Sequence, residues 1–286
     1  MLTNQIVPHL GTKTLQKLKP DIERWHTTLR NGGGADGKRG LAARTIGHAH
    51  RVLSKSFNDA VKNELIVKNI VKVHSAPKPP DEEMIIVHDI PALVAKLKGH
   101  RLEMLAMVSL FTGMRLGEVL ALRWSRVDLD EKVIQVREAI EETEEHGIRF
   151  KAPKSKAGRR DVTLLDILVD ALRDHRKAQL ELRFKLGVGK LPDDALLFAI
   201  LEGAPLSRNA MSAAWADFAT SIRLPDVTFH ALRHTHASQL IDAGVDIVTI
   251  SKRLGHAKPD ITLRIYAHMF KKDDSKAANA INSIFG

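Results

Sequence analysis

The chain contains no cysteine among its 286 residues. This absence excludes disulfide bonds, thiolate zinc sites, iron–sulfur clusters and cysteine nucleophiles. Tyrosine is almost absent as well, and Tyr266 is the only one in the chain. A chain of this length is expected to carry several tyrosines, so the isolation of this phenol is unusual, although it does not by itself establish a role.

Long hydrophobic runs are also missing. The apolar run at residues 196–201 is far shorter than the roughly 20 residues that a membrane-spanning helix needs. The first six residues lack the charged and apolar regions of a secretory signal. We therefore expect a cytoplasmic protein that has no membrane partner.

Positive charge is abundant and unevenly distributed. The net charge is +10, and residues 1–80 hold 14 basic and 5 acidic side chains, so most of the excess lies there. A compact basic segment joined to a nearly neutral body is typical of proteins that bind nucleic acid, because contact with phosphates releases counterions. The alternative is a basic surface that only aids solubility. We favour DNA, and with it an association with the nucleoid of a bacterial or phage host.

Two helices are predicted in the basic segment. Residues 19–30 place Ile22, Trp25 and Leu29 on one face. Residues 41–64 repeat this pattern and carry basic side chains on the opposite face. Such a helix packs on one side and can contact DNA phosphates with the other. The candidate DNA-binding residues of this helix are Arg44, His48, Arg51 and Lys55.

The loop between these helices partly matches a phosphate-binding motif. Gly32, Gly37 and Lys38 have the GxxxxGK spacing, but Arg39 stands where a magnesium-binding Ser or Thr is needed. A helix also precedes the loop, whereas the motif follows a strand. A flexible loop is therefore the better interpretation.

The rest of the chain predicts a second, mainly α-helical domain. Pro-rich residues 76–84 are interpreted as a linker between domains at 1–75 and 85–286. Helical patterns occur at residues 90–97, 102–111, 166–185, 207–222 and 229–243. Residues 132–139, 147–152 and 159–164 predict a small antiparallel β-sheet. No βαβ alternation is present, so the predicted fold class is mainly α with a small antiparallel sheet (α+β).

Three separated motifs contain candidate catalytic residues. Residues 111–118 (FTGMRLGE) place Arg115 just after an apolar helix. Residues 229–238 (FHALRHTHAS) place His230 and Arg233 on one helix face at i, i+3. Residues 254–268 contain His256 and Tyr266. A basic hairpin tip at residues 153–160 adds Lys154, Lys156 and Arg159.

Together, in this order, the motifs resemble those of the tyrosine recombinases of phage-integrase type. The resemblance covers residues 85–285 strongly and the first 75 residues more loosely. It implies a helical core-binding domain at 1–75 and a catalytic domain at 85–286. It also implies a site-specific DNA recombinase that acts on the attachment sites of a mobile element through a 3′-phosphotyrosyl intermediate, without metal, ATP or another cofactor.

The resemblance also implies a role for each matching residue. Tyr266 is the nucleophile, and Arg115 and Arg233 hold the scissile phosphate. His230 assists removal of the phenolic proton, and His256 forms a hydrogen bond with the phosphate. The hairpin lysine that protonates the leaving 5′-oxygen is assigned to Lys154, with Lys156 in reserve because turn lengths vary. Lys156 and Arg159 are further candidates for DNA contact.

The N-terminal region departs from the family pattern. Residues 6–11 resemble the segment that follows the first helix of the core-binding domain, so we expect the usual arm-binding domain to be absent. We therefore expect the domain to lack that helix and to leave apolar residues such as Trp25 or Phe57 exposed.

The resemblance further implies how the protein assembles on DNA. It predicts a C-shaped clamp on duplex DNA, a free monomer and a synaptic homotetramer, with DNA-bending accessory proteins as possible partners. Residues 271–286 would pack against a neighbouring protomer with the apolar side chains Ala278, Ile281 and Ile284, or fold back onto their own protomer.

Three alternative functions stay open: a type IB topoisomerase, a catalytically impaired DNA-binding relic, and a histidine–metal hydrolase that uses His230 and His234.

Overall fold

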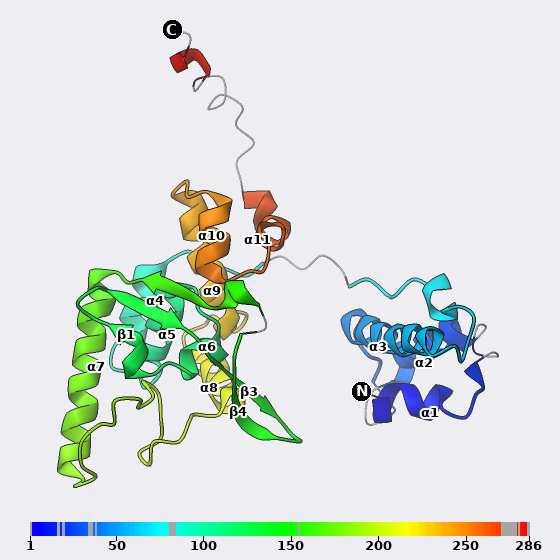
Figure 1. Ribbon diagram of the computed structural model, residues 1–286, viewed down its shortest axis with the longest axis horizontal. Coiled ribbons are helices and arrows are strands. Elements are labelled where there is room, and N and C mark those ends of the chain that lie inside the picture. Colours follow the sequence, from blue (N-terminus) through cyan, green and yellow to red (C-terminus); the bar gives the residue numbers. More distant parts are fainter. Residues whose placement is uncertain are drawn as a thin grey trace. The chain divides into compact units, whose positions relative to one another are not determined.

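The computed structural model describes residues 2–15, 18, 21–33, 37, 39–79, 84–153, 155–269, 279 and 281–284. The chain divides into two compact units, Met1–Glu83 and Met84–Gly286. Figure 1 shows both units. No helix among these described residues is long and apolar enough to span a membrane.

The smaller unit is a helical bundle. It begins with the π-helical turn η1 (Leu2–Ile6) and α1 (Val7–Leu10), continues through α2 (Asp21–Gly32) and α3 (Ala43–Lys62), and ends with η3 (Ile70–Val73). Its core contains the apolar faces predicted for α2 and α3. The basic side chains Arg44, His48, Arg51 and Lys55 are exposed on α3, on the side away from buried Ile46 and Phe57.

The expected exposure of Trp25 and Phe57 is wrong, since each is only 2% exposed. Ile6 and Leu10, from η1 and α1, belong to the same buried cluster and help to cover it. The indole Nε1 of Trp25 also donates a hydrogen bond to the carbonyl of Gln5 at 2.7 Å. The segment before α2 therefore supplies the apolar cover that the sequence pattern had assigned to a missing helix.

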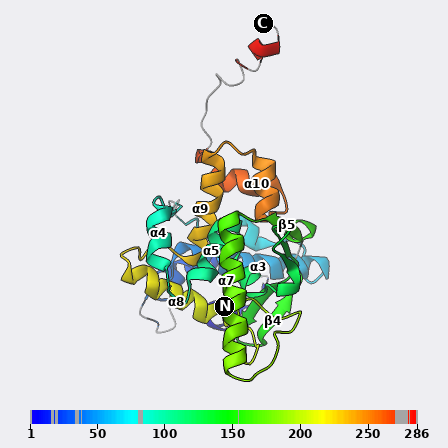
Figure 2. The same ribbon diagram turned by 90° about the vertical axis from the view of Figure 1, so that its left-hand side faces the viewer.

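The larger unit is mainly helical. Its helices are α4 (Ile90–Leu97), α5 (Glu103–Thr112), α6 (Leu116–Leu120), α7 (Asp166–Lys185), α8 (Arg208–Ser221), α9 (Phe229–Asp242), α10 (Ile247–Leu254) and α11 (Pro259–Tyr266). The 3₁₀ turns are η4 (Trp124–Arg126), η5 (Lys156–Gly158) and η6 (Ala267–Met269). Apolar α5 contacts α4, α6, α7 and α9 and is largely buried. Figure 2 shows α7 at the front of the unit, and α5 packs against it from behind.

The strands form two small antiparallel sheets instead of the single predicted one. One sheet has the order β1 (Val127–Asp128), β2 (Val133–Val136), β5 (Arg160–Thr163), and the other pairs β3 (Ala139–Thr143) with β4 (Gly147–Lys151). The predicted strand at 132–139 ends early because β2 pairs with β5, whereas Ala139 already pairs with Lys151 of the β3–β4 hairpin. Arg137 and Glu138 lie between the two sheets.

A pair of buried histidines joins α2 to α3. His26 Nε2 and His50 Nδ1 are 3.1 Å apart. Burial, together with the neighbouring His50, lowers the pKa of His26 to about 4, and burial also lowers the pKa of His50. Both rings are therefore neutral in the folded unit at neutral pH.

We predict that the smaller unit loses stability as the pH falls from about 6.5 toward 4. In this window the unfolded chain takes up protons that the folded pair does not accept. Hydrogen exchange of α2 and α3 peptides, corrected for the intrinsic effect of pH, measures this loss. The control variant His26→Leu/His50→Leu has no ionisable ring at either position, so its exchange should depend less on pH. Equal dependence in both proteins would contradict the prediction.

Candidate active site

A glycine turn between α5 and α6 presents Arg115. Gly113 ends α5 with φ 70°, in the left-handed region that favours glycine. A Cβ at this position would lie 2.7 Å from the ring of His236 and 2.8 Å from Leu254, so the close approach also requires glycine. At the start of α6, the carboxylate of Glu118 accepts hydrogen bonds from the Arg115 backbone N–H at 3.0 Å and from its Nη1 at 2.8 Å.

Helix α9 brings Arg233 to the same turn. Its guanidinium donates from Nη1 to the carbonyl of Gly113 at 2.6 Å, and its Nη2 lies 2.8 Å from His256 Nε2. The side chain is only 2% exposed, and burial lowers the pKa of Arg233 below its ordinary value. An arginine stays protonated even so, because its ordinary pKa lies above about 12. Arg233 is thus a buried cation next to the exposed part of Arg115.

The contact with Arg233 fixes the proton on His256. An arginine nitrogen can only donate, so His256 Nε2 accepts and Nδ1 must carry the ring proton. That Nδ1 lies 2.7 Å from the hydroxyl oxygen of Thr262 in α11, to which it donates. Burial and the charges of Arg233 and Arg115 lower the pKa of His256 to about 4. The ring is therefore neutral at pH 7, and it connects Arg233 to the helix that carries Tyr266.

Tyr266, the last residue of α11, is buried with its hydroxyl facing α9. It is 1% exposed, and its hydroxyl oxygen lies 2.8 Å from Nδ1 of His234. Burial raises the pKa of Tyr266 to about 12, although Arg233 and Arg115 act in the opposite direction. The phenol is therefore fully protonated at neutral pH and needs a proton acceptor before it can act as a nucleophile.

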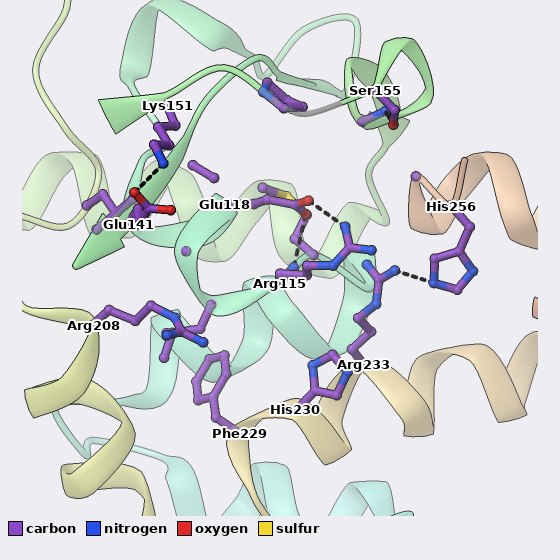
Figure 3. A pocket seen from close by; sticks show the side chains of 18 of the residues that line it. Arg115, Glu118, Glu141, Lys151, Ser155, Arg208, Phe229, His230, Arg233 and His256 are labelled. Atoms are coloured by element: carbon purple, nitrogen blue, oxygen red, sulfur yellow. Dashed lines mark hydrogen bonds and ion pairs between the residues drawn. The ribbon is translucent and has the colours of Figure 1, made fainter. Parts of the chain in front are cut away.

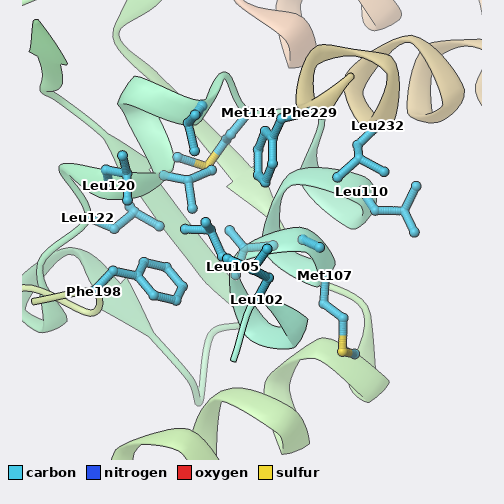
Figure 4. Packing of buried hydrophobic residues seen from close by; sticks show 14 of the residues in the cluster. Leu102, Leu105, Met107, Leu110, Met114, Leu120, Leu122, Phe198, Phe229 and Leu232 are labelled. Carbon is cyan, nitrogen blue, oxygen red and sulfur yellow. The ribbon is translucent and has the colours of Figure 1, made fainter. Parts of the chain in front are cut away.

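These side chains line one cavity of about 940 Å³. Figure 3 shows Arg115, His230, Arg233 and His256 close together. The guanidinium nitrogens that are not used in the contacts above could bind oxygens of one anion. Met114 and Phe229 line the cavity and also pack into the apolar core, as Figure 4 shows, so this part of the lining is continuous with the core.

The structure brings five of the six predicted catalytic residues to this cavity: Arg115, His230, Arg233, His256 and Tyr266. Lys154 lies outside the described residues. Its reserve, Lys156, is exposed in η5, and Arg159 is exposed just after it. The phenol contacts His234, whereas the predicted proton acceptor, His230, packs edge-to-face against His234 with ring centroids 4.7 Å apart.

The family follows from comparison with known proteins. Residues 84–273 match the model of the phage integrase family. The chain is 30% identical over 266 residues to a XerC-like tyrosine recombinase of Caldanaerobacter subterraneus. The alignment covers 87% of this chain and 68% of that protein. It is also 26% identical over 254 residues to the ICEBs1 integrase of Bacillus subtilis, which covers 86% of this chain and 67% of the relative.

This chain belongs to the phage integrase family of tyrosine recombinases. Among solved structures it is similar to the Tn1549 transposon integrase in complex with transposon right-end DNA, with a TM-score of 0.78 and 19% identity over 97% of this chain and 89% of that one. The likeness confirms the fold class expected from the sequence. The enzymes of this family cleave and rejoin DNA.

Sequence reasoning missed the support behind Arg115. Arg160 of β5 is 8% exposed, donates from Nη2 to Glu118 at 2.8 Å and from Nε to the carbonyl of Arg253 at 2.7 Å. Burial by itself raises the pKa of Glu118, but Arg160 and then Arg115 outweigh it and lower the pKa to about 2. The ionised carboxylate therefore joins two arginines, one buried and one facing the cavity.

Two further cations line the cavity. Arg208 at the start of α8 and Lys151 at the end of β4 belong to the lining. Lys151 is paired with Glu141, which also accepts from Arg149 at 2.8 Å. No group of three histidine, aspartate or glutamate side chains within metal-binding reach of one another occurs in the part of the chain that the structure describes.

We predict that Glu118→Ala destabilises the larger unit by about 3–5 kcal/mol, because it leaves the buried Arg160 without its anion. The matched control is Glu138→Ala, which removes the partly exposed partner of Arg123 and should cost no more than about 1 kcal/mol. Urea unfolding measures both. Equal losses in the two variants would contradict the prediction.

Proposed function

We propose that this tyrosine recombinase breaks one DNA strand by attack of Tyr266 on a backbone phosphate and passes the strand to a second duplex. The observation that carries the proposal is the convergence of Arg115, Arg233 and Tyr266 on one cavity. Attack by a phenol exchanges one phosphate ester for another of similar energy, so the break can be resealed without ATP. The intermediate is a 3′-phosphotyrosyl ester with a free 5′-hydroxyl on the other side of the break.

The two arginines supply the electrostatic part of the chemistry. Negative charge grows on the phosphoryl oxygens during attack, and fixed cations in a partly dry site stabilise it strongly. Arg115 spends one donor on the Glu118 side chain, and Arg233 is anchored through two. A guanidinium has five N–H donors, so each arginine keeps others for the phosphate. An incoming phosphate oxygen would also replace Arg233 as the partner of His256 Nε2, provided that this nitrogen gains a proton.

The same proposal covers the binding of DNA. The exposed residues of α3 (Arg44, His48, Arg51 and Lys55) and of the hairpin tip (Lys156 and Arg159) would contact phosphates and position the duplex. The partner is double-stranded DNA at attachment sites, held by both units as a clamp, with four protomers in the synaptic complex. Of the segment predicted to pass between protomers, Ile281 and Ile284 are exposed, whereas Ala278 lies outside the described residues.

The first test is capture of the covalent intermediate. A randomised pool of nicked duplexes, in which the released fragment diffuses away, is incubated with the protein and resolved on a denaturing gel. We expect a protein–DNA adduct with the wild type and none with Tyr266→Phe, since the variant lacks only the nucleophilic oxygen. An adduct of equal yield in the variant would refute the proposal. Relaxation of supercoils without joining of two DNA sites would instead indicate a topoisomerase.

The second test identifies the lysine that protonates the 5′-oxygen. In a duplex whose scissile 5′-oxygen is replaced by sulfur, the leaving thiolate needs no proton, so the general acid becomes dispensable. We expect Lys154→Ala to cleave the ordinary duplex at least about 100-fold more slowly and the sulfur duplex at nearly the wild-type rate. Lys156→Ala is the matched comparison. Rescue of Lys156→Ala alone would move the assignment to Lys156.

A further inference from the structure

The Tyr266 hydroxyl has one hydrogen-bond partner among the residues that the structure describes. That partner is Nδ1 of His234, at 2.8 Å. The two rings meet edge-to-face with centroids 5.8 Å apart, and His234 is only partly exposed. The phenol is therefore hydrogen-bonded to an imidazole before any DNA arrives.

His230 is placed differently, although it lies one turn earlier on the same face of α9. It is the more exposed of the two histidines, and its ring stands at 87° to that of His234. No hydrogen bond joins it to Tyr266 in the described structure, whereas the ring of His234 contacts both the ring of His230 and the phenol. The i, i+4 spacing of the sequence puts both rings on one side of the helix. The position of α11 then brings the phenol of Tyr266 to His234 and not to His230.

We propose that His234 is the catalytic residue that receives the phenolic proton of Tyr266. The assignment rests on the proposed strand cleavage. As the phenolic oxygen bonds to phosphorus, its O–H bond breaks and the proton moves to Nδ1 of His234. The bond between phosphorus and the 5′-oxygen breaks, and the hairpin lysine protonates that oxygen. In the reverse reaction, His234 returns the proton to the tyrosine when the 5′-hydroxyl attacks the phosphotyrosyl ester.

The protonation states of the two groups agree with this direction of transfer. Burial and then the charge of Arg233 lower the pKa of His234, so its ring is neutral at pH 7 and has a lone pair to offer. Because the pKa of Tyr266 is about 12, the proton stays on the phenol in the absence of DNA. Transfer then becomes favourable only as the bond to phosphorus forms, which keeps the nucleophile inactive until a phosphate occupies the cavity.

The first experiment reads the hydrogen bond without DNA. Tyr266 is the only tyrosine, so protein labelled with [¹³Cζ]tyrosine gives a single tyrosine signal. We expect His234→Ala to shift this signal at pH 7, and His234→Asn to shift it less, because an asparagine side chain can occupy the place of Nδ1 and form the same bond. An unchanged signal in His234→Ala would overturn the inference.

The second experiment separates proton transfer from positioning. Asparagine can hold the phenol but cannot take its proton, so His234→Asn should cleave a captured nicked duplex on the order of 10²–10³-fold more slowly than the wild type. The 5′-sulfur duplex should not rescue it, in contrast to the lysine variant, because the defect lies in the nucleophile. Cleavage by His234→Asn at the wild-type rate would show that the residue only positions the phenol and would overturn the inference.

His230→Asn is compared on the same duplex. We expect it to slow cleavage less than His234→Asn does. The reverse order would identify His230 as the proton acceptor and overturn the inference. Failure of the wild type to form any adduct would overturn the proposed strand cleavage itself, and with it the transfer step. A wild type that cleaves beside a fully active His234→Asn refutes only the assignment of the proton acceptor.

Discussion

The site depends on the hydrogen bonds of the buried Arg233 guanidinium. It joins the turn after α5, through the carbonyl of Gly113, to His256, which in turn binds Thr262 of α11. One side chain of α9 thus fixes the turn that carries Arg115 and the helix that carries Tyr266. A cation buried to this degree is costly unless it is fully hydrogen-bonded or meets a counter-charge. Its two hydrogen-bond partners are neutral and the nearby Glu118 carboxylate only partly offsets the effect of burial, so we propose that a phosphate supplies the remaining counter-charge.

In the proposed mechanism, the protonation states of the cavity residues hold the nucleophile in its unreactive form until DNA binds. Its phenol is protonated, His234 and His256 are neutral, and the anionic Glu118 is occupied by Arg115 and Arg160. A bound phosphate would change the charges and protonation states of this cavity in the direction that cleavage requires. It would compensate the two cations, stabilise a protonated His256 and provide the electrophile that draws the proton from Tyr266. The proposed mechanism therefore couples activation of the nucleophile to the binding of the phosphate.

Much of this could be predicted from the sequence, because local patterns carry it. The predicted helix at 166–185 has the bounds of α7, since its apolar period and its polar flanks are local signals. Arg115, Arg233 and Tyr266 could be proposed together because their motifs are short and occur in a fixed order, and the structure places all three around one cavity. The sequence predicts one sheet where the structure has two, because strand periodicity does not determine which strands pair.

The contacts that the sequence could not predict lie between distant segments. The ion pair of Glu118 with Arg160 spans 42 positions, and neither residue type signals burial. His234 was noticed only as a possible metal ligand, because helical spacing places it beside His230 without showing what faces it. The exposure expected for Trp25 failed for the same reason, since Ile6 and Leu10 cover the core from a segment with weak periodicity.

The most direct measurement is a structure of the Tyr266→Phe protein bound to a nicked duplex captured by the wild type. The account predicts that Arg115 and Arg233 both donate to the non-bridging oxygens of one phosphate at about 3 Å, with residue 266 facing the phosphorus from the side of α11. Arg115 and Arg233 on different phosphates, or a scissile phosphate bound outside this cavity, would contradict it.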